Sequence, residues 1–150
     1  MALRPRAGGR PAVSTVGPQA QLSQQSSPAI WGRLVARTFA LPRVEEGRSQ
    51  VSPASSRAVF LRDLHEERAP ETSLAPGRRL EPVHLHGVED TSIHLCLPAP
   101  RVAELTELGW AEAHLYGDFG TEALVYGPRD SDELRIVLGL IEESLAFARR

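Results

Sequence analysis

The sequence predicts an α+β domain, with a mostly antiparallel sheet of five or six strands and about three helices packed on it. Two patterns predict this class. Short apolar runs occur in pairs separated by turn residues, which is typical of hairpins rather than of strand–helix–strand units. Apolar residues recur at helical spacing in three other segments, and the longest of these ends the chain. With 150 residues the chain has the length of one domain.

The segment before residue 28 is expected to be a disordered tail. It is rich in Pro, Gly, Ser and Gln, and its charged residues are all arginines, since the first acidic residue is Glu45. Such a segment buries too little apolar surface to offset the entropy that is lost on ordering. We therefore divide the chain into a disordered tail over residues 1–27 and an α+β domain over residues 28–150.

The first half of the domain predicts one helix and one strand pair. Ser27 is a good N-cap and Pro28 a good first helical residue, so a helix is expected from residue 28 until Pro42 ends it. Two antiparallel strands are expected next, over residues 44–51 and 58–61. A long polar connection is expected to follow them over residues 63–80.

The second half predicts two hairpins, each followed by a helix. The expected strands cover residues 83–86 and 92–97, and then 110–116 and 122–126. A short helix is expected over residues 98–109, where Gly109 stops it. Asp130 caps the last helix, and Glu133 three residues later completes a capping-box pattern.

Composition narrows the class of protein. All 17 basic residues are arginines, and Ala, Gly and Pro are abundant, which indicates a GC-rich bacterial genome rather than a nucleic-acid partner. No apolar run approaches the ~18 residues of a membrane span, and residues 1–28 lack the apolar stretch of a secretory signal. Cys96 is the only cysteine, which excludes an intrachain disulfide and fits a reducing compartment. We expect a cytoplasmic protein without a nucleic-acid or membrane partner, its oligomeric state left open.

Four of the five histidines fall within residues 84–114. Alternate side chains of a strand share a face, so His84 and His86 are expected to point the same way, roughly 7 Å apart, where one ligand contacts both. His94 lies on the expected partner strand. The candidate ligand-binding residues are His84, His86, His94, Trp110, Glu112, His114 and Arg129.

Two kinds of chemistry suit these side chains. Neutral imidazole is the commonest protein ligand of zinc, iron, copper and nickel, so His84, His86 and His114 are also a candidate metal-binding set. General acid–base work is the second, with Glu81 or Glu112 orienting an imidazole. An ordinary structural hydrogen bond between carboxylate and imidazole accounts for the same pattern.

Three further side chains have a structural alternative. Arg129 stands at the start of the last helix, where free backbone N–H groups favour an anionic ligand group, but a salt bridge to a nearby acidic residue is the simpler interpretation. Trp110 fits either the core or the wall of a pocket. Cys96 is expected to be a buried apolar residue rather than a nucleophile.

Several motifs together resemble one family. They are Glu81-x-x-His84-x-His86-Gly87, Ile93-His94-Leu95-x-Leu97-Pro98, Gly109-Trp110-Ala111-Glu112-x-His114 and Val125-Tyr126-Gly127-Pro128-Arg129-Asp130. In this order they resemble the luciferase-domain proteins, small bacterial and fungal proteins, over residues 28–150 and most strongly from residue 81. The resemblance implies a small α+β ligand-binding domain. It does not imply light emission, nor the (β/α)8 barrel of bacterial flavin-dependent luciferases, which needs about 250 residues.

The leading expectation is therefore a protein that binds a small ligand in a histidine-lined pocket, with catalysis left open. Two alternatives remain at this point. One is a non-catalytic protein-interaction module in which the histidines are structural, and the other is a metal-dependent oxidoreductase. All three depend on whether neighbouring strands bring the imidazoles to one enclosed place.

Overall fold

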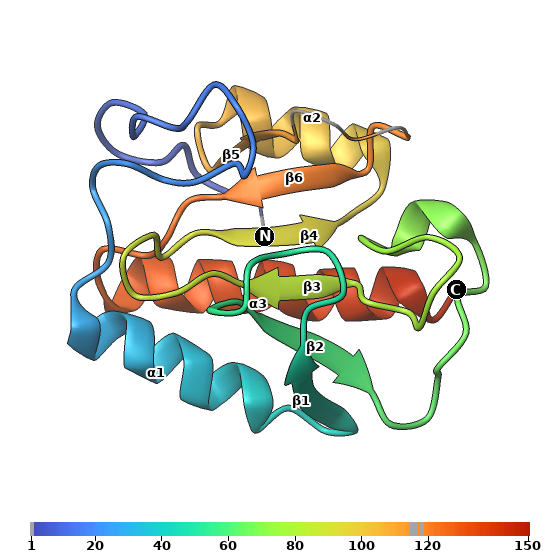
Figure 1. The fold of residues 1–150 in the computed structure, drawn as a ribbon. Helices are drawn as coiled ribbons and strands as arrows, with labels where there is room; N and C mark the ends of the chain where they lie inside the picture. The colour runs from blue at the N-terminus through green and yellow to red at the C-terminus, as the bar shows by residue number, and fades with distance from the viewer. Residues whose placement is uncertain (1, 115–116, 118) are drawn as a thin grey trace.

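The computed structural model describes residues 2–114, 117 and 119–150. The elements of these residues, in chain order, are α1 (Pro28–Phe39), β1 (Val44–Arg48), β2 (Arg57–Leu61), the 3₁₀ turn η1 (Pro70–Thr72), β3 (Val83–Leu85), β4 (Ile93–Cys96), α2 (Ala99–Glu107), β5 (Ala111–Ala113), β6 (Glu122–Val125) and α3 (Ser131–Ala148). The fold class is α+β, as the sequence predicts (Figure 1).

The described strands form one sheet in the order β1-β2-β3-β4-β6-β5. Every neighbouring pair in it is antiparallel. Chain order and sheet order differ only at one edge, because α2 carries the chain past β4 to the outer strand β5, and β6 then returns between them. The expected turn of this last hairpin includes residue 118, which lies outside the described residues.

One face of the sheet packs against all three helices. In Figure 1, α3 runs behind β3, and it contacts both β3 and β4. α1 contacts α3 and β1, and α2 lies along β5 and β6. Alternate side chains of the strands enter this core: Val59, Leu61, Val83, Leu85, Ile93, Leu95, Ala123 and Val125. Since successive strand residues point to opposite faces, the residues between them face away from the helices.

The first helix begins as its sequence predicts. The Ser27 hydroxyl accepts a hydrogen bond from the backbone N–H of Ile30, and Pro28 occupies the first turn. The helix ends at Phe39, three residues before Pro42, and the N–H of Ala40 closes its last turn on the carbonyl of Ala36. Its buried side chains are Trp31, Leu34 and Thr38.

The last helix is capped by a variant of the predicted capping box. Asp130 accepts a hydrogen bond from the N–H of Glu133 at 2.8 Å. The Glu133 carboxylate returns to the N–H of Arg129 at 2.9 Å, one residue before the cap, where a standard box would use the cap residue itself. Two backbone N–H groups at the start of the helix, those of Arg129 and Glu133, thus each donate to a side-chain carboxylate.

The N-terminal segment differs from the expectation of disorder. Residues 2–27 contain no helix or strand, apart from an isolated bridge between Val13 and Gln21, but they pack against the domain. The carbonyl of Arg4 accepts a hydrogen bond from the Trp110 indole, and four polar side chains of the segment are buried: Arg6, Gln19, Gln21 and Ser26. Hydrogen bonds to the domain hold this segment in place. The expectation of disorder was based on the low apolar content of the segment, which does not reflect such hydrogen bonds.

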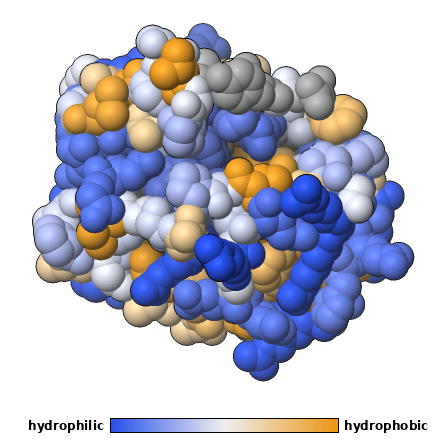
Figure 2. Space-filling view, viewed as in Figure 1, coloured by the Kyte–Doolittle hydropathy of each residue, from blue (hydrophilic) through white to orange (hydrophobic). Residues whose placement is uncertain are grey.

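The surface on the helix-free side is mostly polar. Figure 2, in the same view as Figure 1, shows a largely hydrophilic face with separate hydrophobic side chains. The exposed large hydrophobic residues of the described chain are Val16, Leu22, Val51, Val88 and Phe119. Among the residues described, no helix has the length and apolar character needed to cross a bilayer.

Candidate functional site

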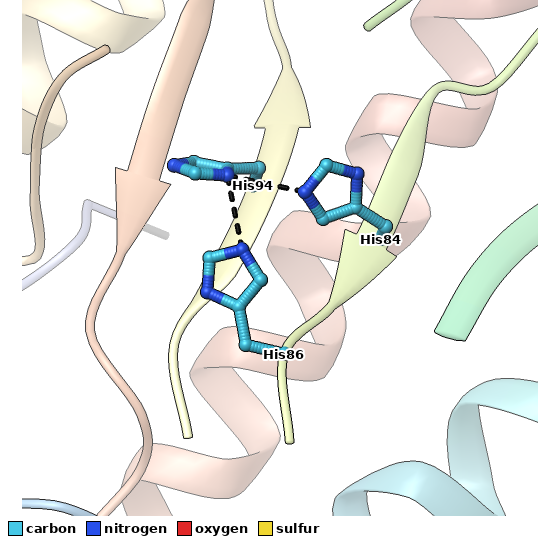
Figure 3. A group of neighbouring side chains, drawn as sticks. All are labelled: His84, His86 and His94. Atoms are coloured by element: carbon cyan, nitrogen blue, oxygen red, sulfur yellow. Dashed lines mark hydrogen bonds between the residues drawn. The ribbon is translucent and has the colours of Figure 1, made fainter. Parts of the chain in front are cut away.

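Three histidines meet on the helix-free face of the sheet. Strand pairing places His84 of β3 directly opposite His94 of β4, and His86 follows one residue after β3 on the same face. The ring centroids lie 5.2 Å apart for His84 and His94, and 4.6 Å apart for His86 and His94. Figure 3 shows the three rings pointing toward one another from neighbouring strands. All three are buried, as their position under covering loops requires.

The contact is made nitrogen to nitrogen. The Nε2 atoms of His84 and His86 each lie 3.1 Å from the Nδ1 atom of His94. His94 is therefore the centre of the group, and its ring is nearly perpendicular to both others.

Glu81 holds the outer nitrogen of His84. Its Oε2 atom lies 2.8 Å from His84 Nδ1, and the fully buried carboxylate also accepts hydrogen bonds from the Ser49 hydroxyl and the Gln50 backbone. Burial raises the pKa of the Glu81 carboxyl, but these hydrogen bonds, first of all that from His84, outweigh burial and lower its pKa from the ordinary value. Burial lowers the pKa of His84, which favours the neutral ring.

Asp90 and Ser92 hold the outer nitrogen of His86. The Asp90 carboxylate and the Ser92 hydroxyl each lie 2.8 Å from His86 Nδ1, and Asp90 also accepts the hydrogen bond of the Ser92 hydroxyl. Burial raises the pKa of Asp90, but its hydrogen bonds, beginning with that from His86, outweigh burial and lower its pKa. Asp90 is therefore ionised beside a ring that donates to it.

Gln19 of the N-terminal segment holds the outer nitrogen of His94. Its Oε1 atom lies 3.1 Å from His94 Nε2, while its Nε2 atom donates to the carbonyl of Ala113 and so orients the amide. Burial lowers the pKa of His94 well below the ordinary value, and the neighbouring imidazoles lower it further. His94 is consequently a neutral ring whose N–H faces Gln19.

The imidazoles form the floor of a cavity of about 340 Å³. His114 joins them, its ring 4.6 Å from that of His94 and its Nδ1 atom 2.6 Å from the Glu122 carboxylate. The remaining lining residues come from the N-terminal segment, the β1–β2 loop and the segment after η1: Pro18, Gln19, Val51, Ser52, Pro53 and Leu74. The pocket thus has a polar floor and a partly apolar wall.

Of the residues predicted from the sequence, the structure brings four histidines to this pocket and leaves three residues elsewhere. Trp110 is buried and donates its indole N–H to Arg4, and Glu112 accepts a hydrogen bond from the Tyr126 hydroxyl at 2.6 Å. Arg129 forms an ion pair with Glu133 at 2.6 Å, which is the simpler of its two interpretations. None of these three lines the cavity.

The group of side chains that could hold a metal ion differs from the predicted set by one residue. The ligand atoms that lie within 4.8 Å of one another, among the described residues, belong to His84, His86 and His94, whereas the sequence predicted His114 as the third member. His94 is nearer than His114 to the other two rings because it lies directly opposite His84 in the adjacent strand. The sequence predicted that the two strands pair but did not fix which residues lie opposite each other.

Several residues of the site were not among the predicted ones. Gln19 lay in the expected tail, Asp90 lay in the expected turn, and Ser92 was the first residue of the expected strand over residues 92–97. The only signal in the sequence was the Asp90-x-Ser92 spacing, which is typical of an aspartate that binds the backbone two residues on, as Asp90 does. Cys96 is 1% exposed and burial raises the pKa of its thiol, so its prediction as a buried apolar residue is confirmed.

Comparison with known proteins identifies related chains. Residues 79–144, which contain all four histidines of the pocket, match the family model of the luciferase domain. The luciferases of Armillaria gallica and Armillaria mellea are each 25% identical to this chain, over 97% of its length and 60% of theirs. The luciferase of Neonothopanus nambi is 29% identical over 45% of this chain and 27% of its own length. This chain therefore spans about 60% of the length of the Armillaria relatives. No solved structure gives a significant match.

Proposed function

We propose that this chain, which matches the luciferase-domain family model over residues 79–144, is a luciferase-domain protein that binds a small organic molecule in the histidine-lined pocket and acts on it there. The observation that carries the proposal is the meeting of four imidazoles at the floor of one cavity. The relatives are named luciferase. For this chain we propose only that it binds a small molecule and acts on it.

The pocket favours a ligand with two unlike ends. Its volume of about 340 Å³ lies at the lower end of the range of roughly 300–1,000 Å³ that small-molecule sites occupy. Pro53 and Leu74 give part of the wall an apolar character, while the imidazoles and Glu122 offer hydrogen bonds at the floor. We infer a compact molecule with an apolar body and a hydroxyl, carbonyl or carboxylate group directed at the histidines.

The floor is arranged for proton transfer. A carboxylate on one ring nitrogen orients an imidazole and stabilises the cation that forms when the other nitrogen accepts a proton. His84 and His86 both have this arrangement, through Glu81 and Asp90 respectively. In the absence of another ligand on these rings, either Nε2 atom would serve as the proton acceptor for a ligand group in the cavity.

Thermal unfolding in the presence of small molecules tests the proposal. A panel of hydroxylated aromatic compounds and small carboxylic acids should contain members that raise Tm, because a ligand at one hundred times its Kd stabilises the folded state by about 2.7 kcal/mol. Val51→Trp, at the rim of the pocket, should abolish the shift by filling the entrance without touching a histidine. Leu22→Trp is the matched control, since Leu22 is similarly exposed but lines none of the pockets described.

Two outcomes contradict the proposal. A shift that persists in the Val51 variant would place the ligand elsewhere. No shift with any compound would favour the alternative of a protein-interaction module, in which the imidazoles only hold the strands together.

A further inference from the structure

We propose that His84, His86 and His94 bind a divalent first-row transition-metal ion of the zinc class through three ring nitrogens. The proposal deepens the proposed function, because the ion would lie at the floor of the same pocket. It rests on the geometry of the rings and on the partners of their outer nitrogens.

The hydrogen bonds of the outer nitrogens fix which tautomer each ring adopts. A neutral imidazole carries one N–H and one lone pair. Since Glu81 and Asp90 are acceptors, the N–H of His84 and of His86 lies on Nδ1, and the lone pair lies on Nε2. Gln19 presents its carbonyl oxygen to His94, so the N–H of that ring lies on Nε2 and the lone pair lies on Nδ1.

Three lone pairs therefore face a common point. His84 Nε2 and His86 Nε2 both approach His94 Nδ1 to 3.1 Å, and in these tautomers no proton lies in either gap. One added proton would satisfy only one of the two contacts. A metal ion accepts all three lone pairs at once, which is why the convergence of the rings points to a cation rather than to a hydrogen-bonded cluster.

The spacing suits a metal ion of this class. Two imidazole nitrogens bound to zinc at about 2.0–2.1 Å are about 2.8–3.4 Å apart for bond angles between right-angled and tetrahedral. The two separations of 3.1 Å fall in that range. All three ligand atoms lie within 4.8 Å of one another.

The outer partners match what metal-binding histidines require. Such rings almost always donate their second N–H to a carboxylate, a carbonyl or water, which fixes their orientation and raises their basicity. Here Glu81, Asp90 and Gln19 provide those acceptors. Two ionised carboxylates also balance the charge of a divalent ion in a buried place, where an uncompensated charge would be costly.

The number of protein ligands is that of a catalytic rather than a structural site. Structural zinc sites are closed by four protein ligands, whereas catalytic sites keep a position for water or substrate. Three histidines leave such a position, and the cavity that His114 and Glu122 line lies beside them. The ion would polarise a ligand oxygen or lower the pKa of a bound water there.

Metal analysis of untagged protein tests the site. Protein purified without a polyhistidine tag, stripped with chelator and equilibrated with Zn²⁺ alone, should retain close to one equivalent. His94→Gln should reduce the Zn²⁺ affinity by at least tenfold, and Glu81→Gln or Asp90→Asn by about 10–100-fold, the usual effect of removing an outer partner. His65→Ala is the control and should bind as the wild type does, because His65 is exposed and lies outside the cluster.

The wild-type protein also gives a test that needs no variant. In ¹⁵N spectra of the imidazoles, Zn²⁺ should shift Nε2 of His84 and His86 but Nδ1 of His94, while His65 stays unchanged. This pattern would distinguish the site from adventitious zinc even if a histidine variant failed to fold.

The metal site and the ligand pocket can fail separately. Wild-type protein that retains less than a tenth of an equivalent, or that shows no imidazole shift at these atoms, overturns the metal site. Compounds that raise Tm in such metal-free protein would leave the proposed function standing. If zinc binds at the predicted atoms but no compound raises Tm, the metal site stands and the proposed function is contradicted.

Discussion

Gly127 is a glycine whose role depends on a close approach. A Cβ atom there would lie 2.1 Å from the carbonyl oxygen of Thr91 and 2.7 Å from the Ser26 hydroxyl. The nearer neighbour is a backbone atom, and Thr91 lies between Asp90 and Ser92, the two residues that contact His86. A side chain at this position must therefore displace the turn beside the site.

We expect Gly127→Ala to lower the free energy of unfolding by about 1–3 kcal/mol, as overpacking of a close contact does. Gly139→Ala is the matched control: it lies within α3 with nothing near its Cβ position, so its better helix propensity should raise stability by up to about 1 kcal/mol. Urea unfolding followed by circular dichroism measures both. Equal stabilities for the two variants would contradict the account of Gly127.

At this scale the sequence predicted the residue types of the site better than their partners. Strand alternation correctly placed His84 and His86 on one face, and Glu81 is indeed bound to an imidazole. Gln19 could not be predicted, because it lies 75 residues from His94 in the chain and nothing in the local sequence links them. Contacts of that separation are fixed by the packed fold rather than by any periodic pattern.

The elements themselves were predicted in the right order, but several are shorter than expected. The expected strand over residues 44–51 ends at Arg48, the last residue paired with β2. Beyond it, the backbone N–H groups of Gln50 and Val51 donate to the side chains of Glu81 and Ser49 instead of to a strand. A site residue thus takes precedence over a strand pattern. The helices deviate less, since their caps are encoded locally in Ser27 and Asp130.

One ion pair ties the end of α3 to the loop after β2. Asp63 accepts hydrogen bonds from Arg149, with one oxygen at 2.9 Å, and lies 3.2 Å from Arg43. The hydrogen bond from Arg149, ahead of the other causes, lowers the pKa of Asp63 to about 2. A folded-state pKa below the unfolded one means that Asp63 stabilises the fold above the unfolded pKa, and that this stabilisation is lost as the pH falls towards 2.

Replacing Asp63 by Asn should flatten the acid side of the stability profile. Wild-type Tm should fall between about pH 4 and pH 2 by more than the Tm of Asp63→Asn does, with the two curves closest at the acid end. Calorimetry at a series of pH values measures this difference. Parallel curves over that interval would show that the Arg149 contact is too solvated to be linked to folding.

The whole molecule divides its tasks between the two faces of one sheet. The helix-covered face holds the apolar core, and the opposite face holds the histidines under a cover of loops and the N-terminal segment. The sequence predicted the first face through periodicity. The cover was missed because its polar residues are held by hydrogen bonds to distant backbone, such as that between Gln21 and Gly127.

Hydrogen exchange should distinguish the observed cover from a disordered tail. The amides of Gln21 and Leu22, which donate to Asp90 and to Ala12, should exchange more slowly than in an unstructured peptide. They should still exchange faster than the amides of β4, which lies in the middle of the sheet. Unprotected exchange throughout residues 2–27 would restore the expectation of disorder.

The antiparallel pairing of β3 with β4 also restricts how the gene can change. His84 faces His94 only while the intervening turn keeps its length, because a shift of one residue in β4 would carry His94 to the helix side and bring Ile93 and Leu95 out. Single-codon insertions or deletions between residues 87 and 92 would therefore remove the chemistry and the core together. The connection over residues 62–69 contributes no side chain to the pocket and no strand to the sheet, so length variation among related genes should accumulate there instead.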